Sequence, residues 1–232
     1  MTVGELLSRI PLPVYCERHT TGLLAEPLNA ASNVAFFIAG YGIYRLIKKN
    51  KLSHWEYHAL FILCLLIGSG SLLWHTIRTT YSLLLDAVPV FIFIGLILYM
   101  VLKNLLKDTL LPLAIVLLLT TLEFLLSIGG YEKILNGSLK YVINAVAFGL
   151  LIGWIYRRYG KHIALQGMGL LCLYLFAIAL RSLDTTICFY LSTGTHFLWH
   201  IVSALKAYLA VRFLIKLNGD RGGRTEAYEL PR

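Results

Sequence analysis

The sequence has few charged residues, few cysteines and few prolines for its length. Of its 232 residues, 14% are charged and 58% are hydrophobic, and there are four cysteines and six prolines. A soluble domain has about 25% charged and about 45–50% apolar residues, so a soluble fold of this chain could not cover its surface with charges. The small number of cysteines excludes a disulfide-dense secreted scaffold, and the hydrophobic content excludes a disordered chain. The composition predicts a polytopic membrane protein.

Long apolar runs dominate the rest of the sequence. A helix needs about 20 apolar residues to cross a bilayer. Such runs are found at about 30–48, 56–77, 80–102, 108–128, 138–156, 163–183 and 196–217, separated by short polar connections. In lipid, a helix satisfies all its backbone hydrogen bonds internally. We therefore predict an all-α integral membrane protein, with a seven-helix bundle over residues 30–217, an N-terminal segment 1–29 and a C-terminal tail 218–232.

Basic residues give the chain a net charge of +9, and they are unevenly distributed between the connections. Basic residues collect in loops that stay cytoplasmic, so the charge does not require a nucleic-acid partner. One set follows the first, third, fifth and seventh segments: Arg45, Lys48, Lys49, Lys51, Lys103, Lys107, Arg157, Arg158, Lys161, Arg212, Lys216, Arg221, Arg224 and Arg232. The other side has fewer: Arg9, Arg18, Arg78, Lys133, Lys140 and Arg181. The bias predicts a cytoplasmic C-terminus and an N-terminus outside, and the short connections favour a bacterial plasma membrane.

Several polar side chains lie inside the apolar segments, where they are costly and by default mark a functional site. The second segment ends with Ser71 and His75, the third has Asp86 near its start, and the seventh opens with His196 and His200. Residues four apart share one face of a helix. In the predicted orientation the three histidines and Asp86 lie in the outer half of the membrane. The sequence thus predicts three imidazoles and a carboxylate at one depth.

This set of residues suits a hydrolytic zinc site. Three histidines with an open fourth position are the usual catalytic arrangement, and zinc lowers the pKa of bound water to about 7. Asp86 could accept the proton of the water and return it to the leaving group, while Ser71 could stabilise an oxyanion. Each histidine alone has a plainer interpretation as a hydrogen-bonding helix partner, but their joint placement favours the metal site.

The motifs at these residues resemble those of the alkaline ceramidases. The shared pattern is Gly-x-Gly-Ser-x-x-x-His over residues 68–75, an Asp eleven residues later, and His-x-x-x-His over 196–200. That family belongs to a wider superfamily of seven-helix membrane hydrolases. The resemblance implies that His75, His196 and His200 bind zinc and that Ser71 and Asp86 are catalytic.

The resemblance extends to segments outside the predicted zinc site. Tyr15-Cys16-Glu17, the segment 25–33, and Arg181-Ser182-Leu183-Asp184 followed by Cys188 are similar to ceramidase segments. It implies that Cys16 and Cys188 form a disulfide, which an oxidising compartment permits.

The family's N-terminal calcium site is only partly matched. Glu17 and Glu26 stand at its acidic positions, but Val14 and His19 replace an Asp and an Asn. Calcium takes six to eight oxygen ligands, so the loss of these two weakens the site and makes calcium doubtful. Glu17 and Glu26 could instead belong to a solvated segment before the first helix.

The leading hypothesis is a zinc-dependent membrane hydrolase that cleaves the N-acyl bond of a ceramide-like or other N-acyl lipid at the extracytoplasmic side. Ester lipids would suit the same chemistry. Trp199, between two ligands, could pack against the acyl chain or simply in the core. The alternatives are a receptor or scaffold with a structural zinc, which would need neither Ser71 nor Asp86, and a transporter or proton relay, which usually has paired broken helices.

Overall fold

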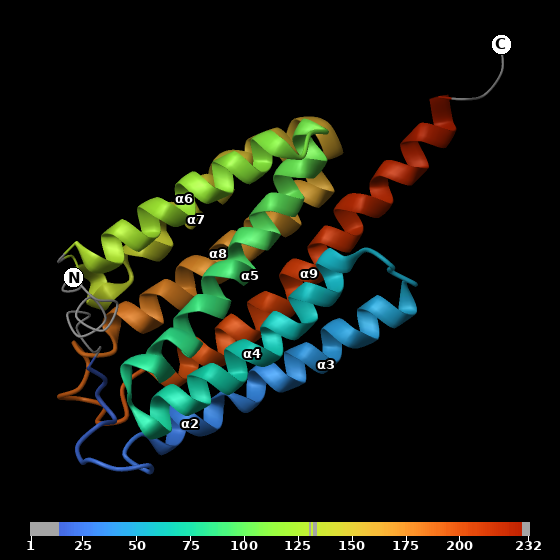
Figure 1. Ribbon diagram of the computed structural model, residues 1–232. Helices are drawn as coiled ribbons and strands as arrows, with labels where there is room; N and C mark the ends of the chain where they lie inside the picture. The colour runs from blue at the N-terminus through green and yellow to red at the C-terminus, as the bar shows by residue number, and fades with distance from the viewer. Residues whose placement is uncertain (1–13, 130, 132–133, 229–232) are drawn as a thin grey trace.

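The computed structural model describes residues 14–129, 131 and 134–228, and within these ranges every regular element is a helix (Figure 1). Seven helical stretches are long and apolar enough to cross a membrane, which confirms the predicted seven-helix bundle. The elements are α2 Pro27–Ser32, α3 Val34–Lys49, α4 Trp55–Ile77, α5 Thr80–Leu106, α6 Leu110–Ile128, η1 Ile134–Gly137, α7 Leu139–Tyr159, α8 Lys161–Leu183 and α9 His196–Tyr228. Helices α2 and α3 together form the first spanning stretch.

Three helix boundaries differ from those expected from the sequence. The first spanning stretch begins at Pro27 rather than residue 30, because proline fits the first turn of a helix. Helix α5 continues past residue 102 and ends where Lys107 adopts a left-handed conformation, with φ of 55°. Helix α9 continues past residue 217 to Tyr228, so most of the predicted tail extends this helix. Residues 1–13 and 229–232 of the predicted terminal segments lie outside the described residues.

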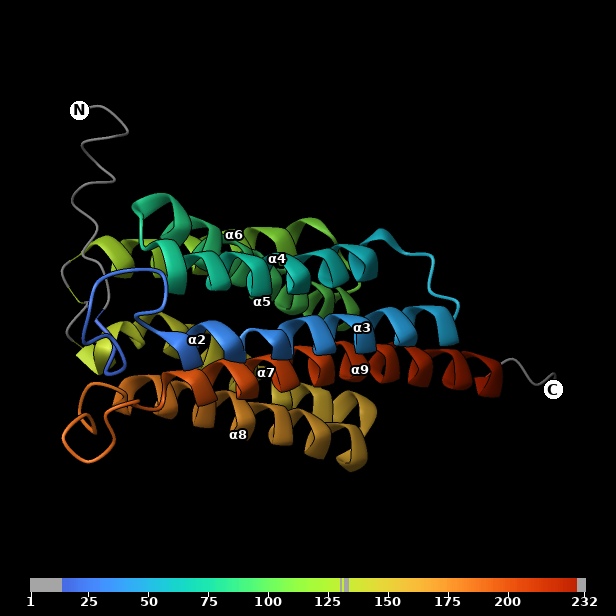
Figure 2. The same cartoon turned by 90° about the horizontal axis from the view of Figure 1, so that it is seen from below.

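Helix α9 is central to the bundle, and α6 is peripheral. Helix α9 packs against α2, α3, α4, α5 and α8, whereas α6 contacts mainly α5 and α7. In the most apolar stretch of each helix, half of the residues of α9 are buried, compared with 11% of those of α6. Figures 1 and 2 show that the segment before α2, the α4–α5 connection and the α8–α9 loop lie together at one end of the bundle. The last turns of α9 extend from the opposite end, so a site at the start of α9 lies among these three connections.

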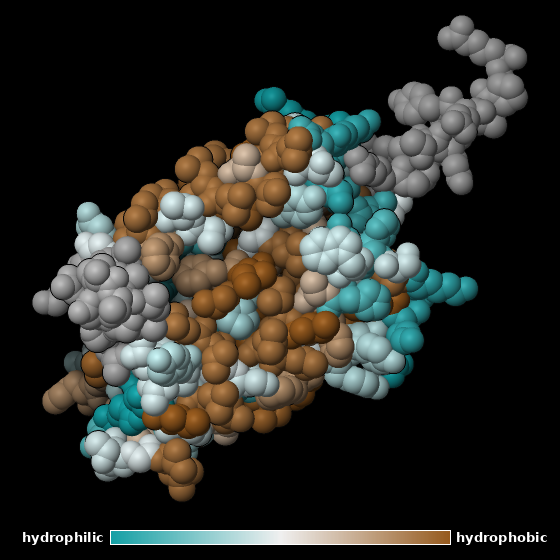
Figure 3. Space-filling model, viewed as in Figure 1, coloured by the Kyte–Doolittle hydropathy of each residue, from teal (hydrophilic) through white to brown (hydrophobic). Residues whose placement is uncertain are grey.

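The outer surface of the bundle is largely apolar. Figure 3 shows hydrophobic residues across the middle of one face and hydrophilic residues gathered mainly at the end with the α3–α4 connection. On α6, the side chains of Leu111, Leu117, Leu118, Leu122 and Leu125 are exposed. Lipid is as apolar as these side chains, so exposing them within a bilayer costs little. The exposed apolar surface is therefore consistent with a protein whose helices contact lipid.

Candidate metal centre

A tight hairpin between α4 and α5 brings the second and third predicted segments together. Arg78 is left-handed, with φ of 60°, and it ends α4. Thr79 and Ser82 form a capping box at the start of α5, in which the Thr79 hydroxyl accepts from the Ser82 backbone N–H at 3.1 Å. A capping box satisfies two of the free N–H groups of a helix start. Only two residues, Arg78 and Thr79, therefore separate α4 from α5, and α5 returns along α4.

Gly70 allows the backbones of these two helices to touch. A Cβ atom at this position would overlap the carbonyl of Leu85 and press on the amide nitrogen of Asp86. Because glycine lacks that atom, α4 and α5 approach closely at this level. The next residue on α4 is Ser71, and its side chain interacts with that of Asp86. The hairpin thus unites the two polar residues that the sequence placed on separate segments.

The start of α9 is fixed by a carboxylate from the end of α8. Asp184 Oδ1 accepts hydrogen bonds from the backbone N–H groups of Thr195 at 2.7 Å and His196 at 2.9 Å, and its Oδ2 accepts from that of Cys16 at 3.1 Å. Gly194 precedes them with φ of 63°, and a Cβ there would overlap the Asp184 carboxylate. Asp184, which is 12 positions before His196 in the sequence, therefore caps the start of α9 and sets the position of His196.

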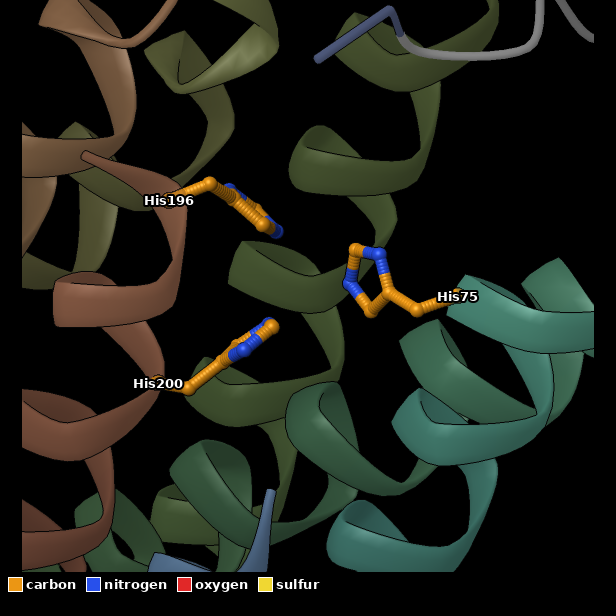
Figure 4. Close-up of side chains that lie close together, drawn as sticks. All are labelled: His75, His196 and His200. Carbon is orange, nitrogen blue, oxygen red and sulfur yellow. The ribbon is translucent and has the colours of Figure 1, made fainter. Parts of the chain in front are cut away.

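The three histidines meet between α4 and α9 and are fully or almost fully buried. One nitrogen from each ring lies within 4.8 Å of the others. The ring centroids of His75 and His196 are 5.2 Å apart, those of His75 and His200 are 4.9 Å apart, and those of His196 and His200 are 4.6 Å apart. Figure 4 shows the imidazoles converging from α4 on one side and α9 on the other. The structure thus brings together the histidines that the sequence predicted as ligands, as a group able to hold a metal ion.

Two of the imidazoles have their outer nitrogen engaged by acceptors. His75 Nδ1 lies 2.5 Å from Glu26 Oε2, and His200 Nδ1 lies 2.7 Å from Ser32 Oγ. A carboxylate only accepts, so His75 donates to Glu26 from Nδ1. The Ser32 hydroxyl donates to the Asn29 carbonyl at 2.9 Å and so can accept from His200. Both tautomers leave Nε2 with a free lone pair, as in histidines that bind metals.

Several nitrogens of the three rings lack protein partners of the ordinary kind. His75 Nε2 and His196 Nδ1 are buried without a hydrogen-bond partner among the described residues. His200 Nε2 lies 3.4 Å from Ser71 Oγ, which is a long contact. Buried polar atoms are nearly always satisfied, so the orphaned His75 Nε2, on the side of the ring that faces His196 and His200, fits a metal ion as its missing partner. Imidazole donors suit zinc, copper, iron and nickel, and a set of three leaves a coordination position open.

The N-terminal segment covers this cluster. Tyr15 is buried with its ring centroid 4.0 Å from that of His196, and its hydroxyl accepts a hydrogen bond from Trp74 Nε1 at 3.2 Å. Burial raises the pKa of the Tyr15 hydroxyl, so it stays protonated. Cys16 is joined to Cys188 by the disulfide that the resemblance implies. The segment is therefore tied to the α8–α9 loop directly over the histidines.

The two acidic residues of this segment have donors from the chain as partners. Glu17 accepts from the backbone N–H groups of Leu28 at 2.6 Å and Asn29 at 2.8 Å. Glu26 Oε1 pairs with Arg18 Nε at 2.7 Å and with Arg78 Nη1 at 2.8 Å. Burial raises the pKa of the Glu26 carboxyl, and the charges of Arg78 and Arg18 oppose that shift. Two guanidinium groups thus neutralise the carboxylate that orients His75.

Sequence reasoning named most of the residues of this site but missed the roles of three. Trp199, predicted beside the ligands, stacks on His196 with the centroids 5.1 Å apart and also lines a cavity. Ser32, Asp184 and the contact of Glu26 with His75 were not foreseen. All three residues lie in segments that resemble ceramidase segments. However, no spacing in the sequence indicates that loops so far apart along the chain fold over one site.

The comparisons with known proteins agree with this geometry. The family model for Ceramidase matches residues 14–230, which is nearly the whole chain. Among curated proteins no match was found. The matched range includes the hairpin, the capped start of α9 and the three histidines, so the family match and the site coincide. This chain of seven spanning helices belongs to the ceramidase family.

Proposed function

We propose that this protein is a zinc-dependent lipid amide hydrolase of the membrane, acting on ceramide-like or other N-acyl lipids. Membership of the ceramidase family implies a hydrolase of amide bonds. The observation that carries the proposal is the convergence of three buried imidazoles, two with orphaned nitrogens, beside the Ser71–Asp86 pair. A zinc ion held by His75, His196 and His200 would supply Lewis acidity and lower the pKa of water.

The roles of the protein residues follow from their chemistry. Asp86 accepts the proton of the attacking water and delivers it to the departing amine, because an amide nitrogen must be protonated to leave. Ser71 donates its hydroxyl hydrogen to the carbonyl oxygen as negative charge develops there. The short α4–α5 connection and the contact at Gly70 hold these two side chains on rigid helices. The bond broken is the amide C–N bond, and the products are a fatty acid and an amine.

The structural-zinc alternative fits the donor set less well. Structural zinc sites are usually closed by four protein ligands. Among the described residues, the cluster comprises three histidines, and the nearby carboxylate of Asp86 interacts with Ser71. An open position beside a carboxylate and a hydroxyl suits a hydrolytic reaction, whether the lipid bond is an amide or an ester.

The test is product analysis. The purified full-length protein, loaded with zinc, is incubated with paired lipids that differ only in an amide or ester link, and products are identified by mass spectrometry. We expect a free fatty acid and an amine from the amide lipids. His75→Ala should abolish product, whereas His58→Ala, at an exposed histidine of α4, should not. Zinc-loaded protein that cleaves neither class of lipid would favour the receptor or scaffold alternative.

We also propose that the histidine end of the bundle faces the extracytoplasmic side. The basic clusters lie on the predicted cytoplasmic connections, and the disulfide at the histidine end requires an oxidising compartment. Tyr190 of the α8–α9 loop and Asn50 of the α3–α4 connection are exposed, and these two connections lie at opposite ends of the bundle (Figure 1). Cysteines placed at these two positions distinguish the two orientations. In intact cells an impermeant thiol reagent should label Tyr190→Cys and not Asn50→Cys, and the reverse pattern would refute the proposal.

A further inference from the structure

A lysine in the middle of the spanning part of α9 has no anionic partner among the described residues. Lys206 is half-buried, and its ammonium nitrogen is 4.1 Å from the ring centroid of Tyr174. In the part of the chain that the structure describes, this ammonium has no ion pair and no hydrogen bond to a protein group. Ionisable groups at such depth are expensive and mark functional sites by default. The proposed hydrolytic reaction does not use Lys206.

Two adjoining cavities surround this lysine. One, of about 40 Å³, is lined by Trp199, Ser203 and Tyr141 among others, and the second, of about 90 Å³, reaches Phe148 and Phe213. Their walls share five residues, which are Phe93, Ile94, Tyr174, Lys206 and Ala207. Trp199 separates the first cavity from His196, on which it stacks. The cavities thus begin beside the metal centre and follow α9 through a mainly apolar interior.

A second polar group faces this interior. The hydroxyl oxygen of Ser203 is buried and has no hydrogen-bond partner among the described residues. Ser203 and Lys206 are three residues apart, so they lie on one face of α9. Along the helix axis they are about 4.5 Å and about 9 Å from His200. A buried hydroxyl without a partner is unusual in proteins, and with the half-buried ammonium on the same face of α9 it points to a ligand oxygen near both groups.

We propose that these cavities hold the acyl chain of the substrate and that Ser203 and Lys206 select chains carrying a hydroxyl group. This proposal rests on the proposed lipid amide hydrolysis. Lys206 donates a hydrogen bond to the oxygen of the chain, and Ser203 completes its hydrogen bonding. A hydroxyl suits the site better than a carboxylate, because a neutral group enters from hydrocarbon at far lower cost than a charged one. An unsubstituted chain leaves both protein groups without partners.

The discrimination should be large enough to measure. Leaving a donor without its hydrogen-bond partner in a mainly apolar cavity corresponds to a roughly ten- to hundredfold loss of affinity. The experiment uses N-acyl lipids of one chain length, unsubstituted or with a hydroxyl at successive carbons, and compares kcat/KM for the zinc-loaded protein. We expect a preference of ten- to hundredfold for a narrow range of hydroxyl positions. A flat profile would overturn the proposal.

Variants assign the preference to the two residues. In Lys206→Met the ratio of hydroxylated to unsubstituted substrate should fall toward one, and Lys206→Gln, which keeps a donor, should restore part of it. Ser203→Ala should lower the ratio less. Lys216→Met is the matched control on the same helix, since Lys216 bonds Gln166 away from the cavities. An unchanged ratio in Lys206→Met would exclude its role in selection.

A binding measurement keeps this inference separate from the proposed function. Zinc-stripped wild-type protein is titrated with the same lipids, and the dissociation constants are compared by native mass spectrometry. Tighter binding of the hydroxylated lipid, lost in Lys206→Met, would support the selection even if no lipid amide were cleaved. Equal dissociation constants would mean that water alone satisfies Ser203 and Lys206, and they would overturn the inference even in an active hydrolase.

Discussion

Glu26 accepts a hydrogen bond from His75, with the carboxylate oxygen and ring nitrogen 2.5 Å apart and both side chains fully buried. The carboxylate comes from the segment before α2, whereas the imidazole comes from the end of α4. Such a partner fixes the tautomer and orientation of a metal-binding histidine and raises its basicity. The N-terminal segment is therefore part of the candidate metal centre, and its residues should affect metal binding without being ligands.

We expect Glu26→Gln to weaken zinc binding by about 10–100-fold, which is typical for the loss of such a partner. The amide keeps the size of the side chain but loses the charge that supports His75. Zinc affinity would be measured by competition with a chromophoric chelator. Glu56→Gln is the matched control, because Glu56 lies at the other end of α4 from His75 and pairs with Lys103 of α5. Wild-type affinity in Glu26→Gln would show that the contact does not support the ligand.

The disulfide should stabilise the cover over the site. It joins residues 172 positions apart and ties Cys16 to the loop whose Asp184 caps α9. Removing a native disulfide costs about 2–5 kcal/mol. Cys16→Ser with Cys188→Ser should lower the free energy of unfolding by that amount and weaken zinc retention. Cys172→Ser, at an exposed free cysteine, serves as the control. Non-reducing peptide mapping that finds free thiols at positions 16 and 188 would contradict the pairing.

Gly70→Ala should damage the site through the backbone. The added Cβ would overlap the Leu85 carbonyl, so α4 and α5 must separate. Overpacking of this kind costs about 1–3 kcal/mol, and it moves Ser71 away from Asp86. We expect lower thermal stability together with a loss of turnover. Gly153→Ala has open space around it and should be neutral or stabilising by roughly 0.5–1 kcal/mol. Equal behaviour of the two variants would mean that the close approach is unimportant.

The sequence predicted the spanning helices and the histidine cluster because both depend on local patterns. Hydrophobic runs of spanning length set the helices, and the spacing of His196 and His200 on one helix puts both on one face. Knowing which segments end at the same side of the membrane was sufficient to predict that His75 lies at the same depth as these two histidines, and the structure brings the three together. No contact between distant segments had to be known.

The partners of the ligands could not be predicted in this way. Ser32 and His200 are 168 positions apart, and their contact depends on how α2 packs against α9. The capping of α9 by Asp184 requires the left-handed turn at Gly194, which no periodicity indicates. Irregular segments are determined by tertiary hydrogen bonds. Their residues were noted through resemblance, but their roles required the structure.

Calcium should be dispensable for this chain. Arg18 and Arg78 already pair with Glu26, and backbone N–H groups engage Glu17, so both carboxylates have positive or donor partners. After removal of all metals with a chelator, zinc alone should restore full hydrolysis, and calcium alone should restore none. A calcium-selective chelator should leave the zinc-loaded protein active. A severalfold increase in activity when calcium is added to zinc-loaded protein would contradict this expectation.

The replacement of Asp86 by Asn should separate metal binding from turnover. Asn matches Asp in size and keeps a hydrogen-bonding group beside Ser71, so the three histidines should hold zinc as in the wild type. It cannot accept a proton, and general acid–base catalysis contributes about 10²–10⁴ in rate. We expect hydrolysis to fall at least about a hundredfold, measured as kcat beside the zinc content and melting temperature of the same preparation. Loss of zinc along with activity would instead make Asp86 a ligand, and unchanged hydrolysis would refute its role as the base.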